Sequence, residues 1–275
     1  MSTKGLCFCS VQINSLSFDA PYFPTLYQGD LCLEQRIKQA HRATYSNSNW
    51  LSFLVLLWPL TVKSELAVDE IYSPRVTAGD LEIGVVGAFL DSEGSEIDNL
   101  RADQWEVGYG LSERLSAELN FNAIKRPGRA YSLEEYEIEL IGNFFQDTES
   151  AAGLFIELSK EHGQKAGGVT LGSLYERQLY AHYSILTNLL VSRSFGEDDE
   201  QLEPTGSLQF AYTKSDTFQP GLEYYGAENN HLMGPAILAE FRMGSSILEL
   251  QAGVAFGLTT DSDDMIYRWE LEIEL

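Results

Sequence analysis

The chain has 275 residues, with 18 Lys and Arg against 41 Asp and Glu, and its formal net charge is −23. Such an acidic composition argues against nucleic acid as a partner, because phosphate recognition needs clustered Lys and Arg. The length allows one large domain or two small ones, and we expect a single folded domain.

The first feature along the chain is a short apolar run, Leu51–Leu60. It is too short to cross a bilayer as a helix, but it has the length of the apolar core of a signal peptide. Basic residues precede it within 36–42, and Val62-Lys63-Ser64 follows it as a small-residue cleavage pattern. We therefore predict export through a cleaved signal peptide, with the apolar core and cleavage region at 50–64.

A signal peptide is expected near the start of a chain, yet residues 1–49 precede this one. Two explanations stay open: a mis-assigned start, with translation beginning near Leu31 or Leu33, or a disordered N-terminal extension. All three cysteines, Cys7, Cys9 and Cys32, lie before the apolar run. The predicted mature protein therefore has neither a disulfide framework nor a cysteine metal site.

Beyond residue 80, apolar and polar residues alternate between turn signals, which is the period of a β-strand. This pattern predicts twelve strands, and an even number is typical of single-chain bacterial outer-membrane barrels. The predicted strands lie near 81–91, 103–111, 115–125, 133–146, 152–160, 169–178, 183–194, 205–213, 217–226, 232–242, 246–257 and 265–275.

The connections between these strands alternate in length. Short ones, such as 112–114, 180–182 and 244–245, are interleaved with longer polar ones, such as 92–102 and 258–264. In membrane barrels short turns face the periplasm and long loops face the cell exterior. We therefore expect both ends of an all-β, antiparallel transmembrane barrel, residues 81–275, on the periplasmic side, with 65–80 as a periplasmic segment that leads into it.

Alternation alone does not separate a membrane barrel from a soluble sandwich, whose apolar row faces a core. The aromatic residues help to decide, because those on the predicted outward face gather at two heights, as in the girdles of a membrane barrel. The alternative is that strands simply favour aromatic residues. The predicted lipid-facing girdle comprises Trp105, Phe121, Tyr136, Phe144, Tyr183, Tyr212, Tyr224, Phe241, Phe256, Tyr267 and Trp269.

The last predicted strand, 265–275, carries its apolar residues on one face and its charged residues on the other. An outer-membrane barrel ends in a strand of this kind, which closes the barrel and is recognised by the assembly machinery. The sequence therefore predicts a location in a bacterial outer membrane and barrel-assembly machinery as a partner of 265–275.

Two segments carry a resemblance to a known family. The first is the pattern Tyr72-Ser-Pro-x-Val-x-x-Gly-Asp-x-Glu-Ile83, and the second is Tyr109-Gly-Leu-Ser-Glu-Arg-Leu-Ser-Ala-Glu-Leu119, with Thr187-Asn188-Leu189 as a further match. They resemble a largely uncharacterised family of proteobacterial outer-membrane barrels similar to those associated with the meta-cleavage pathway of phenol degradation. The resemblance implies an outer-membrane barrel over 70–275, and it implies no catalytic residues.

The predicted inward row is rich in carboxylates. Rings of carboxylates attract cations, and a low-dielectric wall focuses their field. The hypothesis is a passive channel or transporter with a cation-preferring lumen for small cationic or neutral solutes; the alternative is that these residues only keep the inside wet. The row comprises Glu82, Glu106, Glu118, Glu135, Glu137, Glu139, Glu157, Glu223, Glu240, Glu249, Glu270, Glu272 and Glu274, with Arg242 and Arg268.

At the predicted outer strand ends, Lys125 and Arg193 fall on the outward face, where lipopolysaccharide phosphates would favour them beside outer-membrane lipid. Acidic loop residues either bind divalent cations or are solvated loop tips. They are Asp261, Asp263 and Asp264, together with Glu197, Asp198, Asp199 and Glu200. We expect no resident metal or other cofactor.

A second functional alternative is a barrel that conducts nothing and serves envelope structure or assembly. A third is an outer-membrane enzyme of the lipase or protease type, for which His162, His182 and His231 are the histidines beyond the predicted signal. No spacing joins them to a nucleophile, so we expect no catalytic residues and no enzyme.

Overall fold

The computed structural model describes residues 70–92, 98–180, 182–196 and 202–275, all within one compact unit, Trp58–Leu275. The predicted N-terminal extension 1–49, the signal region 50–64 and residues 65–69 lie outside the described residues. Within the described ranges, no helix is long and apolar enough to cross a membrane.

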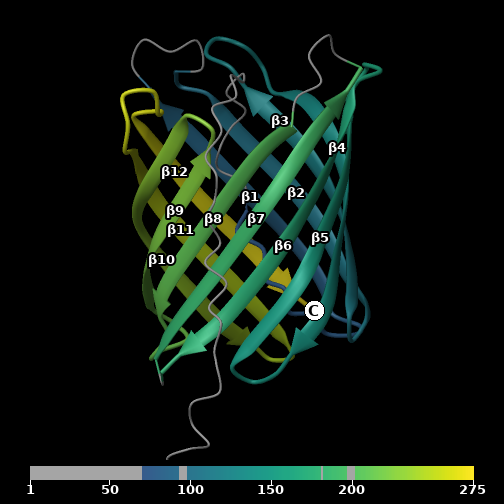
Figure 1. The fold of residues 1–275 in the computed structure, drawn as a ribbon, viewed down its shortest axis with the longest axis vertical. Helices are drawn as coiled ribbons and strands as arrows, with labels where there is room; N and C mark the ends of the chain where they lie inside the picture. Colours follow the sequence, from purple (N-terminus) through teal and green to yellow (C-terminus); the bar gives the residue numbers. More distant parts are fainter. Residues whose placement is uncertain (1–69, 93–97, 181, 197–201) are drawn as a thin grey trace, which may run out of the picture. The chain divides into compact units, whose positions relative to one another are not determined.

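Over these ranges the chain forms twelve antiparallel strands, each paired with its neighbours in sequence, and β1 pairs with β12 to close a barrel (Figure 1). The predicted fold is therefore confirmed. The strands are β1 (Leu81–Asp91), β2 (Arg101–Ser112), β3 (Leu115–Lys125), β4 (Ser132–Gln146), β5 (Ser150–Glu161), β6 (Gly167–Leu179), β7 (Tyr183–Phe195), β8 (Leu202–Tyr212), β9 (Gln219–Ala227), β10 (Asn230–Met243), β11 (Ser246–Gly257) and β12 (Met265–Glu274).

The barrel has two unlike ends. We call the end where β1 begins and β12 ends the turn end, because short connections such as 113–114 and 244–245 lie there. The opposite end, with connections such as 126–131 and 258–264, is the loop end. The alternation in length is not strict, since 228–229 is a two-residue connection at the loop end and 213–218 is a longer one at the turn end.

The wall has the reverse polarity of a water-soluble barrel. On β2, Trp105 is 47% exposed on the outer face while its neighbour Glu106 is 4% exposed on the inner face. On β7, Leu189 is 58% exposed and Asn188 is fully buried. Alternation along the strands, interrupted by register irregularities in the β2–β3, β3–β4 and β4–β5 pairs, turns most apolar side chains outward and most polar side chains inward, so the polar groups are enclosed by the wall.

Part of the interior near the loop end is apolar. There, buried residues of β1 and β9 to β12, including Leu90, Leu232 and Ile266, pack around Ile71. Ile71 precedes β1, so the segment of residues 70–80, which we call the lumen segment, lies inside the barrel. The sequence placed this segment in the periplasm ahead of the barrel; it is instead part of the barrel's filling from residue 70 onward.

Candidate lumen site

Carboxylates line up across neighbouring strands because the strand register places residues of the same face opposite one another. One such row joins Glu118 on β3, Glu139 on β4 and Glu157 on β5 as direct partners. At the β1–β12 seam, Glu82 lies opposite Glu274. Direct cross-strand neighbours have Cβ atoms about 5 Å apart, so like charges are held close together along this row.

A second row runs on the other side of the seam. Glu240 on β10 lies opposite Glu249 on β11, which lies opposite Glu272 on β12. From Glu272 the row continues through Gly84 to Glu106 on β2. The inner wall is thus strongly acidic from β10 through the seam to β5.

The inner face of β6 to β9 is mainly neutral. It presents Thr170, Asn188, Ser207 and Gln209, with Glu223 as a buried carboxylate that accepts hydrogen bonds from Gln209 Nε2 (3.0 Å), Gln251 Nε2 (2.7 Å) and Tyr225 Oη (2.8 Å). The strand pairing places every residue of the predicted inward row on the inner face. These residues are Glu82, Glu106, Glu118, Glu135, Glu137, Glu139, Glu157, Glu223, Glu240, Glu249, Glu270, Glu272, Glu274, Arg242 and Arg268.

The two predicted inward arginines differ in setting. Arg268 on β12 is 4% exposed and donates from Nη2 to Glu270 Oε2 at 2.8 Å. Arg242 pairs with Glu240 at 3.2 Å, but its side chain is 74% exposed at the turn end. A single buried guanidinium beside so many carboxylates leaves the acidic half of the lumen with an excess of negative charge.

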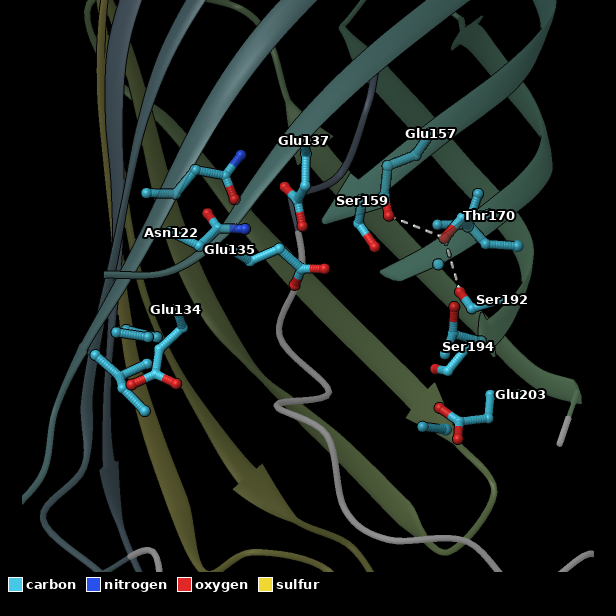
Figure 2. A pocket seen from close by; sticks show the side chains of 18 of the residues that line it. Asn122, Glu134, Glu135, Glu137, Glu157, Ser159, Thr170, Ser192, Ser194 and Glu203 are labelled. Carbon is cyan, nitrogen blue, oxygen red and sulfur yellow. Dashed lines mark hydrogen bonds between the residues drawn. The ribbon is translucent and has the colours of Figure 1, made fainter. Parts of the chain in front are cut away.

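A cavity of about 710 Å³ occupies the loop-end part of the lumen. Glu134, Glu135 and Glu137 of β4 line one side of it, and Figure 2 shows the last two pointing into the same space as Glu157 of β5. Beside them, Thr170 donates to Glu157 at 3.1 Å and shares a 2.9 Å hydrogen bond with the hydroxyl of Ser192 (Figure 2). The cavity also has an apolar side formed by residues of β1 to β3, among them Val86, Ala88, Ala102, Ala123 and Ile124.

Tyr72 of the lumen segment is part of the lining of this cavity. Its backbone N–H donates to Asn188 Oδ1 and its carbonyl accepts from Asn188 Nδ2, both at 2.8 Å. Its ring packs on Phe155 with 4.5 Å between centroids, and its hydroxyl donates to Glu139 at 3.1 Å. The segment is therefore held by a polar pair and an aromatic contact at the middle of the barrel.

Towards the turn end, further bonds fix the lumen segment. Asn143 Nδ2 donates to the carbonyl of Pro74 at 2.7 Å, and Arg75 Nε lies 2.6 Å from Glu176 Oε1. Gly79 N–H donates to the carbonyl of Gly110 at 2.8 Å, which continues the ladder alongside β2. The segment thus narrows the lumen from the turn end to the level of Tyr72.

Loss of solvent, together with the like charges of Glu106 and Glu270, raises the pKa of Glu70 well above its ordinary value.

The sequence alone did not predict the residues that hold the lumen segment. A signal was available in Asn188, a lone amide in the middle of a predicted strand, where an unpaired buried amide would be costly. Nothing local identified Tyr72 as its partner, because the two residues are 116 positions apart.

The predicted girdle residues occupy the outer face. Phe144 is 63% exposed there, and Phe121 packs edge-on against Tyr136 with 5.9 Å between centroids. The outward cations lie at the loop end, where Lys125 Nζ is 5.6 Å from the ring centroid of Tyr131. The remaining predicted girdle residues on this face are Trp105, Tyr183, Tyr212, Tyr224, Phe241, Phe256, Tyr267 and Trp269.

Each of the three histidines considered for catalysis contacts a tyrosine. Nδ1 of His162 is 2.9 Å from the hydroxyl of Tyr136, and Nδ1 of His231 is 2.9 Å from that of Tyr224. The ring of His182 lies edge-on to Tyr212. The backbone N–H of His231 donates to Ser262 Oγ at 2.9 Å, and Asp263 accepts a hydrogen bond from Asn230 Nδ2 at 2.7 Å.

The fold and this lumen define a closed antiparallel barrel with a polar, partly filled interior. No known family profile matches the sequence, and no curated protein matches it. Among solved structures, the chain is similar to an outer membrane channel from Pseudomonas putida F1, with a TM-score of 0.54, 14% identity and coverage of 75% of this chain and 98% of that one.

Two further solved structures match with lower scores. They are the NanC porin (TM-score 0.49, 9% identity, 70% of this chain and 98% of that one) and the KdgM porin in complex with disordered oligogalacturonate (TM-score 0.46, 8% identity, 70% and 97%). At 14% identity, the likeness to the Pseudomonas barrel is one of fold.

Proposed function

We propose that the protein is an outer-membrane β-barrel that passes small cationic or neutral solutes. The observation that carries this proposal is the reversed polarity of the wall: exposed apolar side chains cover the outside while carboxylates and amides are enclosed. Burying that outer face in lipid removes the apolar surface from water, and the closed barrel leaves no strand edge unpaired. The Pseudomonas barrel of similar fold is itself an outer membrane channel.

The acidic half of the lumen supports cation preference. Rows of carboxylates enclosed by a low-dielectric wall raise the local concentration of cations and repel anions. The loop-end cavity, lined by Glu135, Glu137 and Glu157 on one side, is where a solute would first meet this field. A relation to the barrels associated with the phenol pathway stays a prediction of the family resemblance, which does not specify the solute.

Contacts with the envelope belong to the same proposal. Lys125 and Arg193, at the loop ends of β3 and β7, are exposed on the outer face, where phosphates of lipopolysaccharide would favour a positive charge. The strand β12, which pairs with both β1 and β11, corresponds to the predicted recognition strand of the assembly machinery.

A second candidate function is a barrel that conducts nothing and serves the structure or assembly of the envelope. The lumen segment favours it, because Tyr72 and its neighbours fill the middle of the barrel. The two candidates differ in one measurable property, the passage of ions.

The test is ion selectivity in a planar bilayer under a salt gradient, after heat-modifiable gel mobility has shown that the barrel is folded. We expect a cation-selective conductance that falls in the double variant Glu137→Gln, Glu157→Gln. The matched control is Glu113→Gln, an identical change of charge in the exposed turn between β2 and β3. A folded barrel without conductance would favour the second candidate, and a water-soluble β protein would refute the membrane assignment.

A further inference from the structure

Three carboxylates meet inside the barrel near the start of the lumen segment. Glu70 belongs to that segment, Glu106 to β2 and Glu118 to β3, and one carboxylate oxygen of each lies within 4.8 Å of the other two. The cluster therefore connects the lumen segment to the wall of the barrel.

The wall is shaped to receive two of these carboxylates. A Cβ atom on Gly84 would lie 1.9 Å from Glu106 Oε1, so Glu106 rests on the space that this glycine leaves. A Cβ atom on Gly108 would lie 3.3 Å from Glu118 Oε2 and 3.0 Å from Glu82 Oε2. Glycine at both positions allows the acidic side chains to lie close to the backbone rather than extend into open lumen.

A neutral oxygen next to the cluster lacks a partner. Asn120, only 1% exposed, lies directly opposite Glu106 in the β2–β3 register and two residues from Glu118 on the same face. Its Nδ2 donates to Glu139 Oε1 of β4 at 2.8 Å. Among the described residues its Oδ1 has no hydrogen-bond partner.

Two carboxylate oxygens of the cluster share this property. Glu106 Oε2 and Glu118 Oε1 are buried and accept no hydrogen bond from the described residues. Enclosed acceptors and like charges without a donor are costly unless a proton or a cation joins them. The nearby guanidinium of Arg268 donates from Nη2 to Glu270, and its buried Nε and Nη1 have no hydrogen-bond partner among the described residues, so its single positive charge lies near the three carboxylates without forming a hydrogen bond to them.

We propose that Glu70, Glu106 and Glu118, with the amide oxygen of Asn120, form a divalent-cation site that binds Ca²⁺ and clamps the lumen segment to the wall. The donor set is all oxygen and mostly carboxylate, which suits a hard cation rather than zinc or copper. Ca²⁺ accepts an irregular arrangement with six to eight oxygens, whereas Mg²⁺ requires a near-octahedral one. The proposed site follows from the positions of these residues in the barrel and is independent of whether the barrel conducts ions.

The test is isothermal titration of CaCl₂ into the folded full-length protein in detergent, after removal of bound metal with a chelator. We expect one site that weakens at least tenfold in Glu106→Gln and in Glu70→Gln. The matched control is Glu113→Gln, the same change of charge in the exposed turn between β2 and β3, outside both the cluster and the acidic lumen rows, and it should bind Ca²⁺ as the wild type does. Loop carboxylates are present in every variant, so their binding cancels in the comparison.

Three results would refute the site, and the first two are no Ca²⁺ binding by the wild type at millimolar concentration and undiminished binding by both cluster variants. An equal heat with KCl at the same ionic strength would also overturn it, because that response is charge screening. Glu70 lies outside the strands, so Glu70→Gln keeps the test decisive where Glu106→Gln fails to fold. Ca²⁺ binding is measured in detergent and ion conductance in a planar bilayer, so absence of binding can be distinguished from absence of conductance.

Discussion

Asn188→Ala removes the polar pair that holds Tyr72. The substitution leaves the N–H and the carbonyl of Tyr72 without their 2.8 Å partners in a buried place. An unsatisfied buried backbone group costs about 1–3 kcal/mol, so two such groups give about 2–6 kcal/mol. Water in the lumen can replace part of each hydrogen bond, so we expect Asn188→Ala to destabilise the docked lumen segment by about 2–3 kcal/mol. This corresponds to roughly a 30- to 150-fold increase in the population of molecules whose segment is undocked.

Trypsin cleavage after Arg75 measures this population. Arg75 lies in the lumen segment and is held by Glu176, so it is cut only when the segment leaves its place. When opening is fast relative to cleavage, the rate follows the population of the open form. We expect cleavage after Arg75, identified by mass spectrometry, to accelerate by the same factor in Asn188→Ala.

Ser207→Ala is the matched control. The Ser207 hydroxyl donates to the same Asn188 Oδ1 at 3.3 Å, and its removal leaves both bonds to Tyr72 in place. Cleavage in this variant should stay close to the wild-type rate. If Asn188→Ala is cut after Arg75 within twofold of the wild type, while the barrel remains folded, the polar pair does not hold the segment and the argument fails.

Two further predictions concern the turn end. Gly110→Ala should lower stability by about 1–3 kcal/mol, because the new Cβ would lie 1.8 Å from the carbonyl oxygen of Thr77. The urea midpoint of the heat-modifiable gel shift measures this loss. The control is Gly142→Ala, whose Cβ would lie 4.0 Å from its nearest atom. Asp147 accepts the backbone N–H groups of Glu149 and Ser150, both at 2.8 Å, which lowers its pKa. The stabilisation from the Asp147 carboxylate is therefore complete above the ordinary aspartate pKa of about 3.9 and is lost as pH falls through the lowered pKa. Asp147→Ala should be less stable than the wild type at pH 7 and equally stable in strong acid. A difference in stability that stays the same across this pH range would contradict the prediction.

The strands could be predicted from the sequence because a period of two needs only local information. The alternation that places Trp105 outside and Glu106 inside is visible over a few residues, and a slip by one residue would exchange them. The strand ends were less certain: the strand predicted at 205–213 is Leu202–Tyr212. Propensity at an end is weak, and pairing with the neighbouring strand decides where it stops.

The contents of the lumen could be predicted only in part. The facing of Glu118, Glu139 and Glu157 follows from alternation, but their adjacency depends on register across three strands. The position of the lumen segment was not foreseen, because residues 70–80 have no period that indicates where a non-strand segment lies. Its partners, such as Asn188 and Phe155, become recognisable only when the barrel brings them together.

The lumen segment also constrains the order of assembly. Neighbouring strands other than β1 and β12 follow one another in sequence, whereas the β1–β12 seam joins the two ends of the barrel and carries the largest loop-closure entropy. The segment is joined to β1 at Asp80 and binds β4 to β7 on their concave face. We expect the lumen segment to dock on β4 to β7 before the barrel closes. Docking would hold β1 close to the open sheet and so lower the entropy cost of pairing β1 with β12. The residues that narrow the finished barrel would then also act as a template for its curvature.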